Sequence, residues 1–279
     1  MEKINYVTII REIRPIKTTV MLHIKKDMRY IIILTLIGMT ICQESVAQTN
    51  SNPKHYFGFS TQYNQIKEAG NYGLVNQGLN LSLNYSYEKN RRSTIFTYSP
   101  NVAFGANYRN GVGLNWYFKL VDLFYGFRIG KRDGRSLFIG FYGSVNNFWQ
   151  LYPELQSGHM FWFTTIEMGP KFQGSIDMGE RELFIKASIS MYGLTSRPVD
   201  DPEQYYYSLS LGDVLSESFS NMQFGSNNKF NHTFFEIDYT NQNRNKIILG
   251  YAFEYFGYYD DPSFSYMTNS IVLKWPLGK

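Results

Sequence analysis

Long runs in which large apolar residues alternate with small polar ones constrain the fold of this chain more than any other feature. In GLNLSLNYSY (78–87), leucine and tyrosine alternate with glycine, asparagine and serine. Alternate side chains of a β-strand point to opposite faces, so one face of this strand is apolar and the other is polar. The pattern recurs in 93–107, 161–173, 182–194 and 245–258. The sequence therefore predicts an all-β chain.

The composition of the two faces distinguishes between two β architectures. A soluble sandwich needs a packed apolar inner face. Here the apolar face is large and aromatic, whereas the other face is small and hydrogen-bonding with a few charges. A transmembrane barrel alternates in this way between lipid and a polar interior. The runs also extend over about 10–15 residues, whereas an ordinary strand has ~5–6 and a tilted spanning strand needs ~9–11. A transmembrane antiparallel up-and-down β-barrel is predicted, and a soluble β-sandwich is the alternative.

About ten strands are expected, within a range of about 8–12 that also fits such a barrel. They are 54–65, 74–88, 93–108, 111–130, 136–151, 159–176, 182–194, 230–241, 245–259 and 263–275. The fourth strand changes parity in its middle. A β-bulge near Lys119–Val121 would reverse the alternation, whereas a turn there would change the strand count.

The connections alternate in length, which predicts an orientation. Four short polar connections, each with arginine, are KNRR (89–92), KRDGR (131–135), MGER (178–181) and QNR (242–244). Outer-membrane barrels have short periplasmic turns and longer outer loops. Both termini are therefore expected in the periplasm, and the long loop 195–229 is expected outside the cell. The short connections at 109–110 and 260–262 depart from this pattern.

An export signal is predicted before the barrel. Residues 28–47 combine a basic start, an uncharged apolar run and a small-residue cleavage site after Ala47, as a secretory signal peptide does. Residues 1–27 are interpreted as an upstream extension, so that either Met28 is the start or 1–27 are removed with the signal, and 48–279 are expected to form the barrel domain. A membrane anchor and lipoprotein processing at Cys42 are the alternatives for the apolar run.

Composition excludes several classes of function. The one cysteine, Cys42, precedes the predicted cleavage site, so 48–279 cannot form disulfides or a thiolate metal site. The net charge of +4 is dispersed without a basic block, which argues against nucleic-acid binding. Aromatic residues concentrate at membrane interfaces. The expected girdle residues are Trp116, Trp149, Trp162, Trp275, Tyr251, Tyr255 and Tyr258.

From strand length, alternation, turn asymmetry and the signal, 48–279 resembles the small β-barrel proteins of Gram-negative outer membranes. The resemblance implies outer-membrane lipids and the barrel-assembly machinery as partners. That machinery reads an aromatic residue at the end of the last strand; here Trp275 has the right parity, but the chain continues to Lys279. Ten-stranded members include surface proteases, adhesin-like binders and narrow pores. The proteases use paired aspartates and an Asp-His pair, and this chain has no Asp two residues before a His.

Candidate site residues are few. His232, Glu236 and Asp238 share one parity, so His232 near the outer rim is a weak candidate for a general base oriented by a carboxylate. The alternative is an interior salt-bridge network. Its expected further members are Arg128, Glu167, Lys171, Lys186, Glu254 and Lys274. No catalytic residue is assigned.

Metal and ligand sites are also weakly indicated. The aspartate pairs Asp200-Asp201 and Asp260-Asp261 are weak candidates for a calcium site at the outer rim. Each pair is followed by proline, which is typical of turns, so no metal or cofactor is expected. The loop 195–229 has near-helical apolar spacing around Leu211–Met222 and is expected to bind an unknown extracellular ligand.

The sequence thus predicts an integral outer-membrane β-barrel with a binding or envelope-structural role and no enzymatic activity. One alternative is a narrow passive channel. Another is a rim hydrolase that acts on lipid or peptide through His232.

Overall fold

A computed structural model of the protein describes residues 53–69, 73–132, 135–152, 159–198, 212, 216–241, 245–260 and 263–277. The predicted upstream extension (1–27) and signal peptide (28–47) lie outside these residues. Within the described segments, no helix is both long and apolar enough to cross a membrane.

In this part of the chain, thirteen strands form one antiparallel sheet. They are β1 (Lys54–Glu68), β2 (Val75–Asn90), β3 (Thr94–Tyr98), β4 (Asn101–Arg109), β5 (Gly113–Arg132), β6 (Arg135–Tyr152), β7 (His159–Asp177), β8 (Arg181–Ile189), β9 (Tyr192–Ser196), β10 (Gln223–Ser226), β11 (Phe230–Asn241), β12 (Asn245–Tyr258) and β13 (Phe264–Leu277). Strands β3 and β4 make one stave of the barrel wall, and β8 and β9 make another. The short β10 pairs with β9. The described residues therefore form the ten predicted staves.

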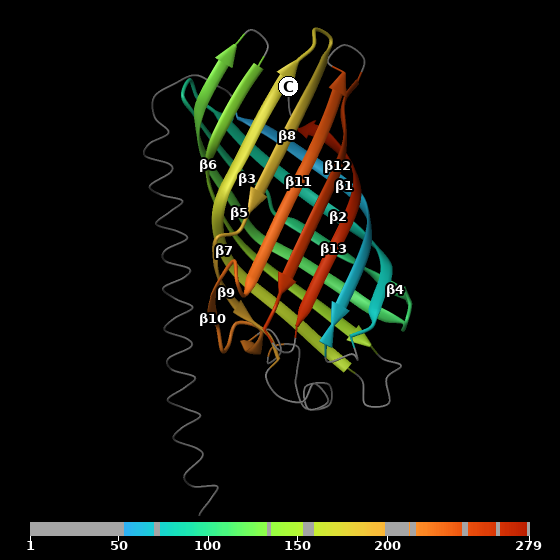
Figure 1. Ribbon diagram of the computed structural model, residues 1–279. Coiled ribbons are helices and arrows are strands. Elements are labelled where there is room, and N and C mark those ends of the chain that lie inside the picture. The colour runs from blue at the N-terminus through green and yellow to red at the C-terminus, as the bar shows by residue number, and fades with distance from the viewer. Residues whose placement is uncertain are drawn as a thin grey trace, which may run out of the picture. The chain divides into compact units, whose positions relative to one another are not determined.

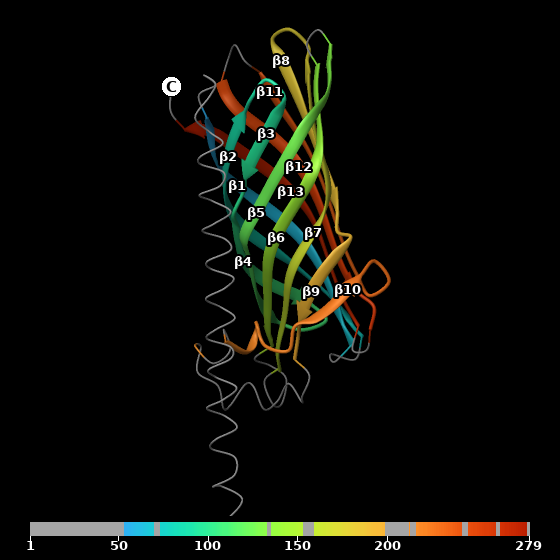
Figure 2. The same cartoon turned by 90° about the vertical axis from the view of Figure 1, so that its left-hand side faces the viewer.

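The sheet closes on itself (Figures 1 and 2). β1 pairs with both β2 and β13, and β8 pairs with both β7 and β11. Paired residues can be followed from stave to stave once around the wall. Starting from Trp149 on β6, this path returns to β6 at Leu137, so the shift is 12 residues. In a barrel of ten staves, this shift corresponds to strands tilted by roughly 40° from the barrel axis, which is within the usual range.

The wall is apolar on its outer face, and many of the inward side chains between the apolar ones are polar. On β2, Leu79 and Leu81 are 50% and 43% exposed, whereas Asn80 and Ser82 between them are 1% and 0% exposed. The same division holds on β12, where Leu249 is exposed and Glu254 is buried. This is the architecture of outer-membrane β-barrels, in which lipid covers the outer surface. The predicted fold class is confirmed.

The staves contain irregularities that change which residues face inward. The register shifts between Lys119 and Val121, so the bulge predicted there is confirmed and β5 is one continuous stave. A second break at 190–191 separates β8 from β9 and was not predicted. Unbroken alternation along 182–194 would place Tyr192 on the inward face with Lys186, but after this break Tyr192 is 48% exposed on the outer surface.

The aromatic girdle is only partly as predicted. Four of the seven expected residues lie on the outward face and are exposed or half-buried: Trp116, Tyr251, Tyr255 and Trp275. Trp149 and Trp162 also have outward parity, but they are buried and pack together. Tyr258 was wrongly placed, because it lies inside the barrel among other aromatic rings.

The two ends of the barrel differ. Connections of two or three residues separate β2 from β3, β5 from β6, β7 from β8 and β11 from β12. The ends of these strands lie together, uppermost in Figure 1, and we call this the short-turn end. The connections 69–74, 110–112, 153–158, 197–229 and 259–263 meet at the opposite, long-loop end. The predicted alternation of connections is therefore present in the fold.

The exposed leucines of the wall provide a test of lipid contact. Leu249 is 52% exposed on β12 between two other exposed apolar residues, Ile247 and Tyr251. We expect Leu249→Arg to lower the free energy of unfolding by roughly 2–4 kcal/mol in lipid vesicles, the cost of arginine near the bilayer midplane. Urea titration of refolded protein measures this change. Tyr108→Arg, 62% exposed near the long-loop end, is the control and should cost ~0–1 kcal/mol. An equally small effect at Leu249 would contradict lipid contact.

Candidate functional site

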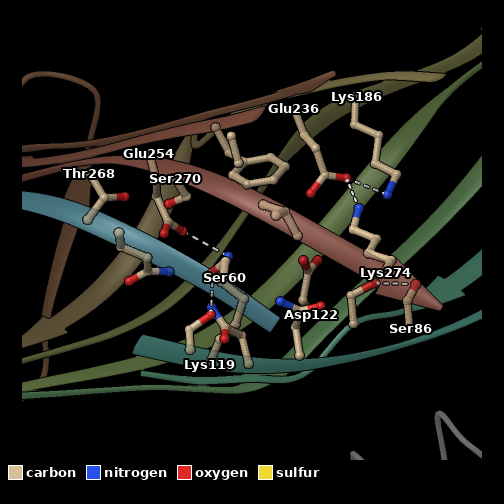
Figure 3. Close-up of a pocket in the computed structure, with 18 of the residues that line it drawn as sticks. Ser60, Ser86, Lys119, Asp122, Lys186, Glu236, Glu254, Thr268, Ser270 and Lys274 are labelled. Carbon is tan, nitrogen blue, oxygen red and sulfur yellow. Dashed lines mark hydrogen bonds and ion pairs between the residues drawn. The ribbon is translucent and has the colours of Figure 1, made fainter. Parts of the chain in front are cut away.

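Four charged side chains form a cluster inside the barrel toward the short-turn end, and Figure 3 shows three of them, Lys186, Glu236 and Lys274. The Glu236 carboxylate on β11 accepts hydrogen bonds from Lys186 Nζ on β8 at 2.6 Å and from Lys274 Nζ on β13 at 2.9 Å. Lys274 Nζ also donates to Asp238 Oδ2 at 2.5 Å. The side chains of Glu236, Asp238 and Lys274 are largely buried. This cluster joins β8 to its neighbour β11, and it joins β11 to β13 on the far side of β12.

A second cluster lies nearer the middle of the lumen. The Glu254 carboxylate on β12 accepts hydrogen bonds from Lys119 Nζ at 2.8 Å and from the Tyr117 hydroxyl at 3.1 Å, both on β5. His232 Nε2 also contacts Glu254 Oε1 at 3.1 Å, and its Nδ1 contacts Glu167 on β7. Because β5 and β12 lie on opposite sides of the wall, the contacts of Lys119 and Tyr117 with Glu254 cross the lumen. The contact of His232 with Glu167 passes over the single stave, β8 and β9, that separates β11 from β7.

Both ring nitrogens of His232 face carboxylates. An ionised carboxylate only accepts hydrogen bonds, so a ring that bonds to two of them must donate from both nitrogens, as the imidazolium does. The two clusters and the Lys171–Asp122 pair (3.3 Å) contain five carboxylates and four lysines. An imidazolium at His232 makes their total charge zero, which the cost of burying unpaired charge favours.

The predicted network is largely present, with changes in membership. Glu167, Lys171, Lys186, Glu254 and Lys274 all take part. Arg128 does not pair with a carboxylate in the described residues; it donates to Asn90 Oδ1 at 3.2 Å and lies over the Phe138 ring. Lys119 and Asp122 belong to the network and were missed.

The three residues of the candidate catalytic cluster do face inward together, as their parity predicted. The structure nevertheless divides them, because His232 contacts Glu167 and Glu254, whereas Glu236 and Asp238 bind lysines. His232 is 2% exposed and stacks on Phe256 at 3.7 Å between ring centroids. With both nitrogens engaged, the ring has no free position that takes a proton from a substrate.

An internal cavity of about 90 Å³ separates parts of the charged network. Figure 3 shows Lys119, Asp122 and Glu254 on one side and Lys186, Glu236 and Lys274 on the other. Serine and threonine hydroxyls complete much of the lining: Ser60, Ser82, Ser86, Ser99, Thr268 and Ser270. At ~10–15 Å³ per site, the cavity has room for roughly six water molecules.

Aromatic side chains fill the lumen toward the long-loop end. The buried cluster contains Ile66, Ala103, Tyr117, Phe148, Phe161, Phe163, Phe230, Phe256, Tyr258, Phe264 and Tyr266. This cluster was not predicted, because inward parity was equated with polar character along whole strands. The signal was available, since phenylalanine occupies inward positions in β6, β7, β11, β12 and β13 near their long-loop ends.

Buried amides occupy the wall beside the aromatic cluster. Asn64 Nδ2 donates to Asn80 Oδ1 at 2.9 Å, and Asn115 Nδ2 donates to Asn107 Oδ1 at 2.8 Å. Gln150 Nε2 donates to Asn115 Oδ1 at 3.2 Å, which links β6 to β5. Each of these side chains is at most 1% exposed. The long-loop half of the lumen is thus packed with side chains.

The calcium candidates are not brought together by the described residues. Asp260 Oδ2 is bound by Lys229 Nζ at 2.9 Å, and this hydrogen bond raises the pKa of Lys229. Asp200, Asp201 and Asp261 lie outside the described part of the chain. No group of three or more His, Cys, Asp or Glu residues among those described is placed to hold a metal ion.

Only part of the loop 195–229 is described. It contributes β10, which extends β9 as a hairpin, and a turn at 227–229. Of the amphipathic helix expected around Leu211–Met222, residues 212, 216 and 217 are helical, residues 218–222 are not, and residues 211 and 213–215 lie outside the described part. Ser196 Oγ donates to the Ser220 carbonyl at 2.5 Å and fixes the loop to the end of β9.

Comparison with known proteins yields barrels of several kinds. The outer-membrane protease OmpT from Escherichia coli is 8% identical, with 82% of this chain and 99% of that chain covered and a TM-score of 0.46. The translocator domain of the autotransporter NalP from Neisseria meningitidis is 7% identical, with 87% and 94% covered and a TM-score of 0.41. Neisserial surface protein A is 9% identical, with 80% and 98% covered and a TM-score of 0.35. No protein-family model and no curated protein matches the sequence. At these identities and TM-scores, the comparisons carry no conclusion about role.

The charged cluster at the short-turn end gives a prediction about stability. Lys274→Met removes a cation from Glu236 and Asp238, so that one buried carboxylate loses its closest partner. We expect the free energy of unfolding to fall by roughly 3–5 kcal/mol, the usual cost of breaking a buried ion pair. Urea titration in detergent micelles or vesicles measures this. Adding Asp238→Asn should recover part of the loss. If the double variant lost more free energy of unfolding than the two single variants lose together, the pairing of Lys274 with Asp238 would be contradicted.

Proposed function

We propose that the chain is an integral outer-membrane β-barrel with a binding or envelope-structural role and no catalytic activity. The observation that supports this proposal is the filled lumen. A transport pathway needs a continuous water path, whereas here charged pairs cross the middle of the barrel and aromatic rings occupy its long-loop half. The side chains of the interior therefore serve to hold the wall together.

The aromatic cluster spans the lumen through ring contacts. Phe148 on β6 lies 5.6 Å from Phe264 and 4.8 Å from Tyr266 on β13, measured between ring centroids. Phe163 on β7 lies 4.8 Å from Phe264. Tyr117 on β5 lies 6.1 Å from Phe256 on β12. Rings from opposite staves thus meet at the centre, and each such pair adds about 0.5–1.5 kcal/mol beyond its area burial.

An exposed aromatic pair supports binding at the long-loop end. Tyr192 on β9 and Phe224 on β10 stack at 6.1 Å with an interplanar angle of 19°. Phe224 is 65% exposed, although it belongs to a hydrogen-bonded hairpin. Rigid aromatic side chains are enriched in protein interfaces. We propose that loop 195–229 faces the outside of the cell and offers this surface to an extracellular ligand, with both termini in the periplasm.

The two other functions have less support. A narrow passive channel is favoured by the hydroxyl-lined cavity of about 90 Å³, but it requires the aromatic cluster to move. A hydrolase acting through His232 requires that residue to reach a substrate, and His232 lies beneath Phe256 with both ring nitrogens bound.

Conductance in planar bilayers tests the proposal. We expect purified, refolded protein to give no single-channel steps in concentrated salt. The variant Phe148→Ala/Phe163→Ala/Phe264→Ala removes the rings that meet across the lumen and should give steps if those rings are the barrier. Folding of both proteins is checked by heat-modifiable migration on gels. Steps of equal size and frequency from the unaltered protein would overturn the filled-lumen account and favour the channel.

A further inference from the structure

A groove of about 430 Å³ lies on the outer surface at the short-turn end, across β5, β6, β7 and β8. Leu137, Phe172, Ile176 and Ile185 form its apolar walls. Each of them neighbours an inward residue of its strand, so each points outward. This surface is the one that faces lipid. The groove is within the ~300–1,000 Å³ typical of small-molecule sites.

Missing side chains and a bulge create the groove. The register between β5 and β6 shifts between Arg128 and Gly130, which displaces the end of β5. A Cβ at Gly130 would have its nearest contact at 3.9 Å, with Leu137 Cβ. A Cβ at Gly174 would approach Leu137 Cδ1 to 3.2 Å. The hollow at Gly130 is thus open space that a larger side chain would fill.

One end of the groove is basic. Arg135 lines it and is exposed, and it belongs to the turn KRDGR (131–135). The other short turns also carry arginine, in KNRR, MGER and QNR. Arginine binds phosphate through its planar guanidinium. An apolar slot in the hydrocarbon region that ends at an arginine near the membrane surface matches a lipid with an anionic headgroup.

We propose that this groove binds one acyl chain of a phospholipid from the leaflet at the short-turn end, with the lipid phosphate on Arg135. Hydrocarbon surrounds this face of the barrel, so the groove must be filled by a chain from that leaflet. The glycines allow the chain to approach the backbone of the wall closely. The inference goes beyond the proposed function and requires only that the barrel spans the membrane.

Native mass spectrometry of the full barrel in detergent tests the proposal. The protein is washed free of lipid and titrated with palmitoyl-oleoyl phosphatidylglycerol, and bound lipids are counted. We expect one tightly held lipid. Gly130→Leu should weaken its binding about ten-fold, the factor expected when roughly two buried methylene groups lose contact. Arg135→Gln should weaken it several-fold and reduce its salt dependence.

Two matched variants serve as controls. Gly143→Leu adds the same side chain to an outward position of β6 that does not line the groove; a Cβ there has its nearest contact at 3.7 Å. Arg181→Gln removes a charge from another short turn. Both should bind within about two-fold of the unaltered protein. Unchanged binding by Gly130→Leu, or an equal loss in Gly143→Leu, would overturn the proposal. Retention of lipopolysaccharide in place of phosphatidylglycerol would overturn it too. The two proposals can fail independently: single-channel steps in bilayers would refute the filled lumen, but they would not change the lipid binding measured here.

Discussion

Hydrocarbon offers the backbone no hydrogen-bond partner, and the rest of this structure depends on that constraint. Closure of β1 on β13 and of β8 on β11 gives each of the ten staves a hydrogen-bonded neighbour on both sides, and among the described strands only the short β10 pairs on one side alone. Closure in turn encloses a lumen that must be filled or wetted. The chain fills it with paired charges toward the short-turn end and with aromatic rings toward the long-loop end. Each inward charge then requires an inward partner, and this requirement explains why Glu254 binds both Lys119 and His232.

Period-2 alternation was sufficient to predict the ten staves, their inward and outward faces, and the bulge at Lys119–Val121. It did not predict the breaks at 99–100 and 190–191, because a break shows only as a change of parity, and Ser99 and Ser190 suit either face. It also missed β10. That strand has four residues and exists because β9 offers it a partner, so its cause lies in pairing and not in local sequence.

The candidate site was less predictable than the fold. Parity places His232, Glu236 and Asp238 on one face, but it does not say which inward residue of another strand lies at the same height. That depends on the shift of 12 residues around the wall, which brings Lys119 on β5 next to Glu254 on β12, 135 residues away in sequence. Lys119 and Asp122 lie on opposite sides of the bulge, so a single parity cannot place both inward. Tyr258 was assigned to the girdle because aromatic residues occur at interfaces, but its inward parity gave the correct position.

Cysteine scanning of β12 tests the central claim most directly, that one side of each strand touches lipid and the other lines the lumen. The sequence from 48 onward contains no cysteine, so single substitutions from Ile247 to Tyr255 can each carry one fluorescent label. We expect a quencher confined to the lipid tails to quench labels at the odd-numbered positions and to spare those at the even-numbered positions between them. Equal quenching at all positions, or quenching at none, would contradict it.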